Sequence, residues 1–177
     1  MTRLSFLTCF LVLCSILLIP SQSHRPLPKR HVALFIFGDS QFDAGNNNYI
    51  NTTAEFKENF YPYSESFFTY PTGRPSYGRL VPDFIAEYAK LHLISTFLPS
   101  FNNKFIYGVN FASRGVGALV ETYQGFVIDL KTQVSYFRIV EKQLKPKLGD
   151  SGTKTLSSEA VYLFNTCSND YFFLLLR

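Results

Sequence analysis

Three polar segments of this chain carry residues suited to acyl transfer, and each directly follows an apolar run. The first is Gly38-Asp39-Ser40, after the unbroken apolar stretch 32–37. The second is the glycine-containing turn 113–117, and the third contains Asn169. A short apolar run bounded by turn residues is typical of a strand buried on both faces, and such strands form parallel sheets. Ligands bind beyond the carboxyl ends of parallel strands, so we expect the three segments to meet there.

This combination of groups could hydrolyse an ester. A serine hydroxyl attacks the carbonyl carbon, while backbone N–H groups and an amide stabilise the oxyanion. Ser40 is the candidate hydroxyl: Gly38 permits a sharp exit from the strand, and Asp39 and Ser40 are suitable caps for a helix that follows. Gly-Asp-Ser alone is a common tripeptide, however, and an ordinary polar turn explains it equally well. Asn169-Asp170 alone also favours a simple turn.

A longer pattern resembles a known family. The sequence from Phe37 to Asn47 reads Phe-Gly-Asp-Ser-x-x-Asp-x-Gly-Asn-Asn, which resembles the first signature block of plant GDSL esterase/lipases of the SGNH hydrolase superfamily. Four further segments follow in the family's order, at 71–74, 78–86, 107–113 and 168–171. The resemblance implies a secreted hydrolase of lipid or other acyl esters.

The resemblance also implies roles for individual residues. Ser40 would be the nucleophile, and Gly117 and Asn169 would be oxyanion-hole donors. Gly115 is an alternative to Gly117, although the spacing Ala-Ser-x-x-x-Gly favours Gly117. The resemblance implies no cofactor, no metal, and a small acyl ester as substrate.

The family's catalytic base is missing from this sequence. Family members supply their histidine and aspartate from an Asp-x-x-His motif near the C-terminus of a longer chain. No aspartate here is followed by a histidine three residues later. His24 and His31 precede the first predicted strand, and His92 closes a predicted helix. The chain therefore resembles the amino-terminal half of a GDSL hydrolase, and we expect impaired or absent turnover. The alternative is a non-catalytic secreted remnant or binding protein.

Three segments depart from the family pattern. Cys167 stands where the third block, Gly-x-Asn-Asp, has glycine, which makes its turn unusual. Arg114 occupies a loop that is normally built of small residues. Pro75 and Tyr77 replace the usual aromatic residue and Asp/Asn.

The element pattern predicts an α/β fold. Apolar runs near 34–37, 105–111 and 161–164 predict strands. Helical spacing of apolar residues predicts helices from Leu80 to His92 and over 130–148. Gly149 is a natural C-cap for the second helix, and Pro146 indicates that its last turn is irregular. The aromatic segment 51–76 has no period and predicts an irregular connection whose rings either line an acyl pocket or pack over the sheet. The order predicts a three-layer α/β/α parallel sheet, which the resemblance identifies as the SGNH-hydrolase type, incomplete at its C-terminal side.

The N-terminus favours secretion. A basic start, an apolar stretch and small residues predict a signal peptide over 1–23, with a signal anchor as the alternative. We expect residues 24–31 to form a flexible lead-in, and the resemblance implies that 32–177 form a partial SGNH/GDSL hydrolase domain. Cys9 and Cys14 lie in the predicted signal peptide, so we expect Cys167 to have no intrachain partner in the mature chain. Asn51-Thr52-Thr53 is a glycosylation sequon.

Composition narrows the possible partners. The 177-residue chain has a net charge of +4, scattered rather than clustered, which argues against nucleic-acid binding. We expect no stable membrane anchor. A phosphate- or metal-handling protein that uses Asp39, Asp43 and Asn169 is a third interpretation, but it calls for further carboxylates at strand ends, and the sequence places none there.

Overall fold

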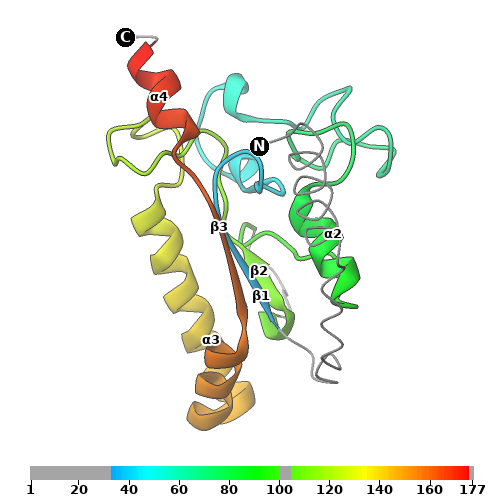
Figure 1. The fold of residues 1–177 in the computed structure, drawn as a ribbon, viewed down its shortest axis with the longest axis vertical. Coiled ribbons are helices and arrows are strands. Elements are labelled where there is room, and N and C mark those ends of the chain that lie inside the picture. The colour runs from blue at the N-terminus through cyan, green and yellow to red at the C-terminus, as the bar shows by residue number, and fades with distance from the viewer. Residues whose placement is uncertain (1–32, 100–104, 176–177) are drawn as a thin grey trace, which may run out of the picture. The chain divides into compact units, whose positions relative to one another are not determined.

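The computed structural model describes residues 33–99 and 105–175, which are built around a small parallel sheet. The strands are β1 (Leu34–Gly38), β2 (Gly108–Asn110) and β3 (Val161–Asn165), in the order β2-β1-β3. Leu34 pairs with Gly108 on one side and with Val161 on the other, so all three strands run in the same direction (Figure 1). The predicted parallel sheet is confirmed.

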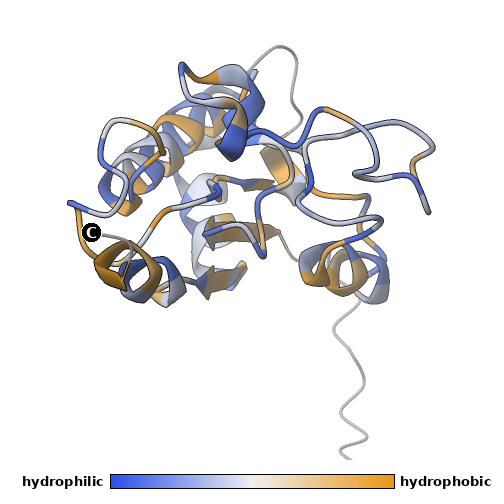
Figure 2. Ribbon diagram, turned by 90° about the horizontal axis from the view of Figure 1, so that it is seen from above, coloured by the Kyte–Doolittle hydropathy of each residue, from blue (hydrophilic) through white to orange (hydrophobic). Residues whose placement is uncertain are grey.

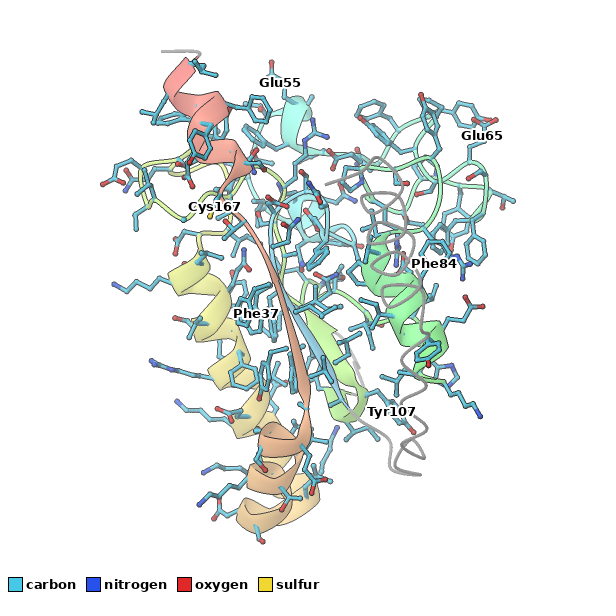
Figure 3. The ribbon with its side chains drawn as sticks, in the orientation of Figure 1. Phe37, Glu55, Glu65, Phe84, Tyr107 and Cys167 are labelled. Carbon is cyan, nitrogen blue, oxygen red and sulfur yellow. The ribbon has the colours of Figure 1, made fainter. Side chains whose placement is uncertain are left out.

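Strand β1 is buried on both faces because helices cover the sheet from opposite sides. Its alternate side chains point to opposite faces. Phe35 and Phe37 pack on the α3 side with Val140, and Leu34 and Ile36 pack on the α2 side with Ala86. Burying each of these large side chains stabilises the fold by roughly 1.5–3 kcal/mol. Figure 3 shows Phe37 between the sheet and α3, and Phe84 on α2. The α/β class is therefore confirmed.

Helix α2 covers Val81–Tyr88 and is shorter than predicted. It begins where the Asp83 carboxylate accepts the Leu80 N–H at 2.8 Å. It ends because Lys90 adopts a left-handed backbone with φ 58°, and the Leu91 N–H returns to the Ala86 carbonyl. His92 therefore lies beyond the helix, contrary to the expectation that it closes it.

Helix α3 covers Leu130–Glu159 and is longer than predicted. The Asp129 carboxylate caps its start by accepting the Thr132 N–H at 2.8 Å. Gly149, with φ 72° and ψ 171°, interrupts it at the predicted C-cap. A second helical stretch then continues to Glu159, which we did not predict because its apolar positions are few.

The second predicted strand, 105–111, is mostly not a strand. Phe105–Tyr107 forms a 3-10 helix, η3, and only Gly108–Asn110 pairs with β1. The turn places Phe105 in the core, where it is buried with Phe97 and Phe111. An apolar run indicates that a segment is buried, but it does not distinguish a buried strand from a buried turn.

The connections hold two short 3-10 helices and one α-helix that the sequence pattern did not predict. They are η1 (Asn46–Tyr49), η2 (Ala54–Phe56) and α4 (Ser168–Leu175). No α-helix follows Ser40 directly, so the predicted helix cap is wrong; a turn leads instead to η1. Segment 51–76 is irregular apart from η2, as predicted.

Two further expectations concern the ends of the chain. The proposed signal peptide, 1–23, and lead-in, 24–31, lie outside the described residues. Within 33–99 and 105–175, the helices are too short or too polar to cross a membrane.

Candidate active site

Ser40 lies at the carboxyl end of β1, where the strand leaves the sheet. The turn is fixed from two sides: the Ser113 N–H donates to the Gly38 carbonyl at 2.8 Å, and the Asp39 N–H donates to Asn165 at 2.9 Å. The Gln133 side chain of α3 completes the frame by accepting the Gly38 N–H at 2.9 Å. Ser40 itself is partly exposed. The serine is thus accessible on a firmly held turn.

Asp39 joins this turn to the third polar segment. Its carboxylate accepts hydrogen bonds from the Asn165 amide at 3.1 Å and the Ser168 hydroxyl at 3.2 Å. It also accepts the Gln41 N–H at 3.1 Å. Burial raises the pKa of Asp39 above its ordinary value, although these hydrogen bonds act in the opposite direction. Segments 39–41 and 165–168 are therefore adjacent.

Asp43 joins the same turn to the second polar segment. Its carboxylate accepts the Gly45 and Asn46 N–H groups at 2.8 Å each on one oxygen, and the Arg114 N–H at 2.8 Å on the other. Burial raises the pKa of Asp43 to about 6. The Asn47 amide donates to the Arg114 carbonyl at 2.9 Å. Both peptide groups of Arg114 are thus held by the first signature block.

Asn169 lies beside the glycine loop. Its side-chain amide donates to the Val116 carbonyl at 2.9 Å, which places it next to the Val116–Gly117 peptide. A Cβ on Gly117 would lie 1.9 Å from the Asp170 carboxylate, and a Cβ on Gly115 would lie 2.3 Å from the Phe56 ring. Both positions therefore require glycine for packing. Asn169 bonds to the peptide next to Gly117, which favours Gly117 as the second donor.

Cys167 occupies a backbone conformation that suits glycine. Its φ is 94°, a region that residues with a Cβ rarely adopt. It lies where β3 passes into α4, directly before the third polar segment (Figure 3). The replacement of the family's glycine therefore leaves the turn in place but strains its backbone.

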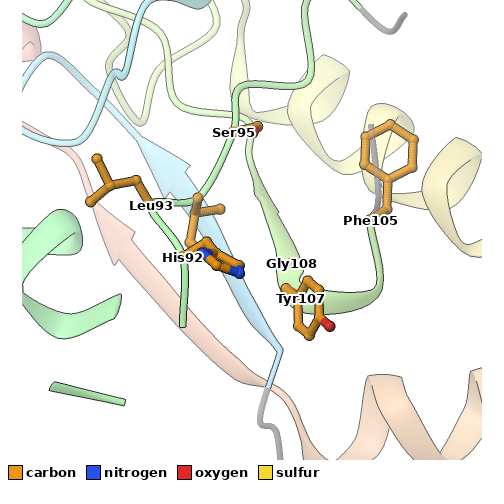
Figure 4. Close-up of a pocket in the computed structure, with 7 residues that line it drawn as sticks. His92, Leu93, Ser95, Phe105, Tyr107 and Gly108 are labelled. Atoms are coloured by element: carbon orange, nitrogen blue, oxygen red, sulfur yellow. The ribbon is translucent and has the colours of Figure 1, made fainter. Parts of the chain in front are cut away.

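His92 lies at the opposite end of the sheet from Ser40. Its ring packs against Tyr107, with ring centroids 6.2 Å apart, just before the start of β2. Both line a hollow of about 250 Å³ together with Ser95 and Gly108 (Figure 4). Figure 3 shows Tyr107 and Cys167 at opposite ends of the sheet. His92 is therefore not placed to act on Ser40, and we find no other histidine within 33–99 and 105–175.

The sequence pattern missed several supporting residues. Asn46 donates to the carbonyls of Asn110 and Ala112, and Gln133 holds both polar groups of Gly38. Asn46 lay within the recognised first block and could have been assigned a bracing role. Gln133 gave no signal, because a glutamine on a helix is ordinarily solvated. In the described part of the chain, no three His, Cys, Asp or Glu side chains gather in a way that could hold a metal ion.

The comparison with protein families agrees with this arrangement. The family model described as GDSL-like lipase/acylhydrolase matches residues 34–174. The chain belongs to the GDSL lipase/acylhydrolase family. The match includes all three strands and the candidate residues Ser40, Gly117 and Asn169 of this GDSL chain.

Curated plant proteins are similar to this GDSL chain. GDSL esterase/lipase 1 of Arabidopsis thaliana is 57% identical over 141 residues, which cover 78% of the chain and 38% of that protein. GDSL esterase/lipase 2 of the same plant is 50% identical over 174 residues, or 94% of the chain and 46% of that protein. The GDSL lipase of Tanacetum cinerariifolium is 48% identical over 161 residues, or 91% and 44%. The chain therefore spans less than half the length of these relatives. No solved structure matches it significantly.

Proposed function

We propose that this chain carries the nucleophile and oxyanion side of an ester-hydrolase site. Ser40 attacks a small acyl ester, and the Gly117 N–H and Asn169 amide stabilise the oxyanion. The observation that carries the proposal is the convergence of three loops at one sheet edge: Asp39 bonds to Asn165 and Ser168, while Asn169 bonds to Val116. The family membership and the names of the relatives, esterase/lipase and lipase, support the same reaction class.

We further propose that the 177-residue polypeptide alone turns esters over slowly. A serine hydroxyl without a base is a poor nucleophile at neutral pH. The sequence holds no Asp-x-x-His, and His92 is at the far end of the sheet. In the serine protease subtilisin, loss of the catalytic histidine costs about 10⁶-fold in turnover, or roughly 8 kcal/mol of barrier. Within 33–99 and 105–175 no histidine lies near Ser40, so we propose that the base comes from outside these ranges.

The test is hydrolysis of a nitrophenyl ester by the purified chain, beside a Ser40→Ala control. We expect turnover near the control. Adding imidazole supplies a free base, and mass spectrometry should then find an acyl group on Ser40. Clear Ser40-dependent turnover without imidazole contradicts the proposed need for an external base. No acylation with imidazole contradicts the nucleophile assignment.

The alternative is a non-catalytic secreted binding protein. The specific observation that favours it is the strained backbone of Cys167, two residues before Asn169. In this case an ester analogue binds, but Ser40 stays unmodified in imidazole. The same experiment therefore separates the two functions.

We also propose that the chain is secreted and carries a glycan. The basic and apolar N-terminus supports cleavage after residue 23, and Asn51 is exposed in the described structure, as glycosylation requires. Mass spectrometry of the product from a secreting plant cell line should show a new N-terminus near His24 and a glycopeptide at Asn51. An intact Met1 on a cytosolic product contradicts secretion.

A further inference from the structure

Two different segments of the chain hold Arg114: residues 43–47, which follow Ser40, bind its backbone, and Glu58 binds its side chain. The Asp43 carboxylate and the Asn47 amide bind its two peptide groups at 2.8 and 2.9 Å. Its guanidinium binds the carboxylate of Glu58, two residues beyond η2. Arg114 thus connects three segments at the loop that carries the proposed oxyanion donor.

Glu58 is a costly residue to bury, and Arg114 is its partner. The Glu58 side chain is completely buried, and its second oxygen, Oε2, has no hydrogen-bond partner in the described structure. A buried carboxyl group that is ionised needs another group to compensate its charge. The guanidinium of Arg114, whose side chain is 32% exposed, provides that compensation.

The same segment packs beneath the next residue of the loop. The Phe56 ring contacts Gly115 so closely that a Cβ there would lie 2.3 Å from the ring. Val116, one residue further, offers its carbonyl to Asn169 at 2.9 Å. The path from Glu58 through Arg114 to the proposed oxyanion donors is therefore short and made of direct contacts.

We propose that the Glu58–Arg114 contact positions the oxyanion loop 113–117, so that Arg114 is a positioning residue for the Gly117 and Asn169 donors. That Gly117 and Asn169 bind an oxyanion rests on the proposed function, but the positioning of loop 113–117 by the Glu58–Arg114 contact does not. Arg114 replaces the small residue that the family resemblance leads us to expect, and Glu58 lies outside every signature segment. The pair is thus a feature of this chain rather than of the signature.

The test is amide hydrogen exchange of the purified full chain at pH 8. Three amides report the loop: Val116 donates to Ser113, and Ala118 and Leu119 donate to Asp170. In Arg114→Met and in Glu58→Ala, we expect these amides to exchange at least about tenfold faster, equivalent to roughly 1.4 kcal/mol. The double variant should add little, because both changes remove one contact. Glu58→Gln keeps the acceptor for Arg114 and should retain most of the protection.

Arg79→Met is the matched control, because it breaks the Arg79–Glu87 pair away from this loop. A loop change no larger than in this control overturns the inference, as does an equal change at the strand amides of β1 and β3. The NMR signal of the Asn169 side-chain amide should shift in Arg114→Met and stay unchanged in Arg79→Met. Neither measurement needs Ser40 to react, so failure of the proposed function is recognised separately, by the acylation experiment.

Discussion

At the scale of single residues, the signature block around Ser40 is mainly a brace. Asp39 and Asp43 each bind a different neighbouring loop, and burial raises the pKa of both. The charged form of such buried carboxylates is stabilised by hydrogen bonds from protein donor groups, because little solvent reaches them. The polar residues of the signature block around Ser40 therefore serve mainly to join neighbouring loops, rather than to act on the Ser40 hydroxyl.

Glu58 should make the stability of the chain depend on pH. Burial raises its pKa from 4.5 to about 7, with the Arg114 charge opposing and the Asp43 charge adding to the rise. A carboxyl whose pKa rises on folding stabilises the fold when protonated. That contribution is complete below about pH 4.5 and is lost as pH increases through 7, a fall of roughly 3 kcal/mol. Urea unfolding from pH 4.5 to 8 should show this fall, and a smaller one in Glu58→Gln. If the free energy of unfolding falls equally with pH in the wild type and in Glu58→Gln, Glu58 is not the group responsible.

Cys167 should be a removable source of strain. Replacing it with glycine relieves the φ of 94° and should increase the free energy of unfolding by about 1 kcal/mol or more. Cys167→Ala is the matched control, because it removes the thiol but keeps the Cβ. Urea midpoints measure both variants. If alanine stabilises as much as glycine, the thiol rather than the backbone is responsible.

At the scale of elements, α4 is fixed to the glycine loop through one carboxylate. Asp170 accepts the N–H groups of Ala118 and Leu119 at 2.8 and 3.2 Å, as well as the Thr122 hydroxyl. Burial acts to raise the pKa of Asp170, but these hydrogen bonds outweigh it and hold the pKa below 3.8. The start of α4 and the loop thus form one unit.

The substitution Asp170→Ala should separate the start of α4 from the glycine loop. Three donors lose their acceptor, so we expect the free energy of unfolding to fall by about 2–3 kcal/mol. Exchange at Ala118 and Leu119 should accelerate with it. The control is Asp150→Ala, which breaks only the exposed Lys145–Asp150 pair and should change stability by less than about 1 kcal/mol. A similar loss in both variants argues against the anchoring role.

At the scale of the whole described structure, one sheet edge is covered and the other is open. Beside β2, the Phe97 N–H donates to Asn110, and Asn110 in turn donates to Ser95. Beside β3, no described strand pairs with the outer edge, and Val161 and Phe164 are 44% and 64% exposed. The adjoining α4 is also largely apolar (Figure 2). An uncharged open strand edge favours association.

The purified chain should therefore self-associate. Val161→Lys places a charge on the open edge and should reduce association, as measured by light scattering over a concentration series. Leu93→Lys is the matched control, because Leu93 is 37% exposed and lies close in sequence to Ser95, which covers the opposite, β2 edge of the sheet. A wild-type chain that stays monomeric throughout contradicts the prediction. Equal improvement by both lysines shows that general charge, rather than the edge, is responsible.

The elements that depend on local pattern could be predicted from the sequence. The apolar runs predicted β1 and β3, because a strand buried on both faces leaves no polar position. Spacing predicted all of α2, although the predicted range ran on past its end to His92, and the first part of α3 up to Gly149. The signature segments predicted the family. These features depend on neighbouring residues, so they can be predicted without knowing what packs against them.

Tertiary structure alone decided the contacts between distant segments. Phe105 to Tyr107 forms a turn because the core accepts Phe105 there. His92 lies too far from Ser40 to act as its base, because its segment contacts Tyr107 at the opposite end of the sheet. The Glu58–Arg114 pair joins residues 56 positions apart and left no pattern. Neither charge is unusual in a sequence, because an isolated Glu or Arg is ordinarily solvated. Burial makes the pair consequential, and burial depends on the folded chain.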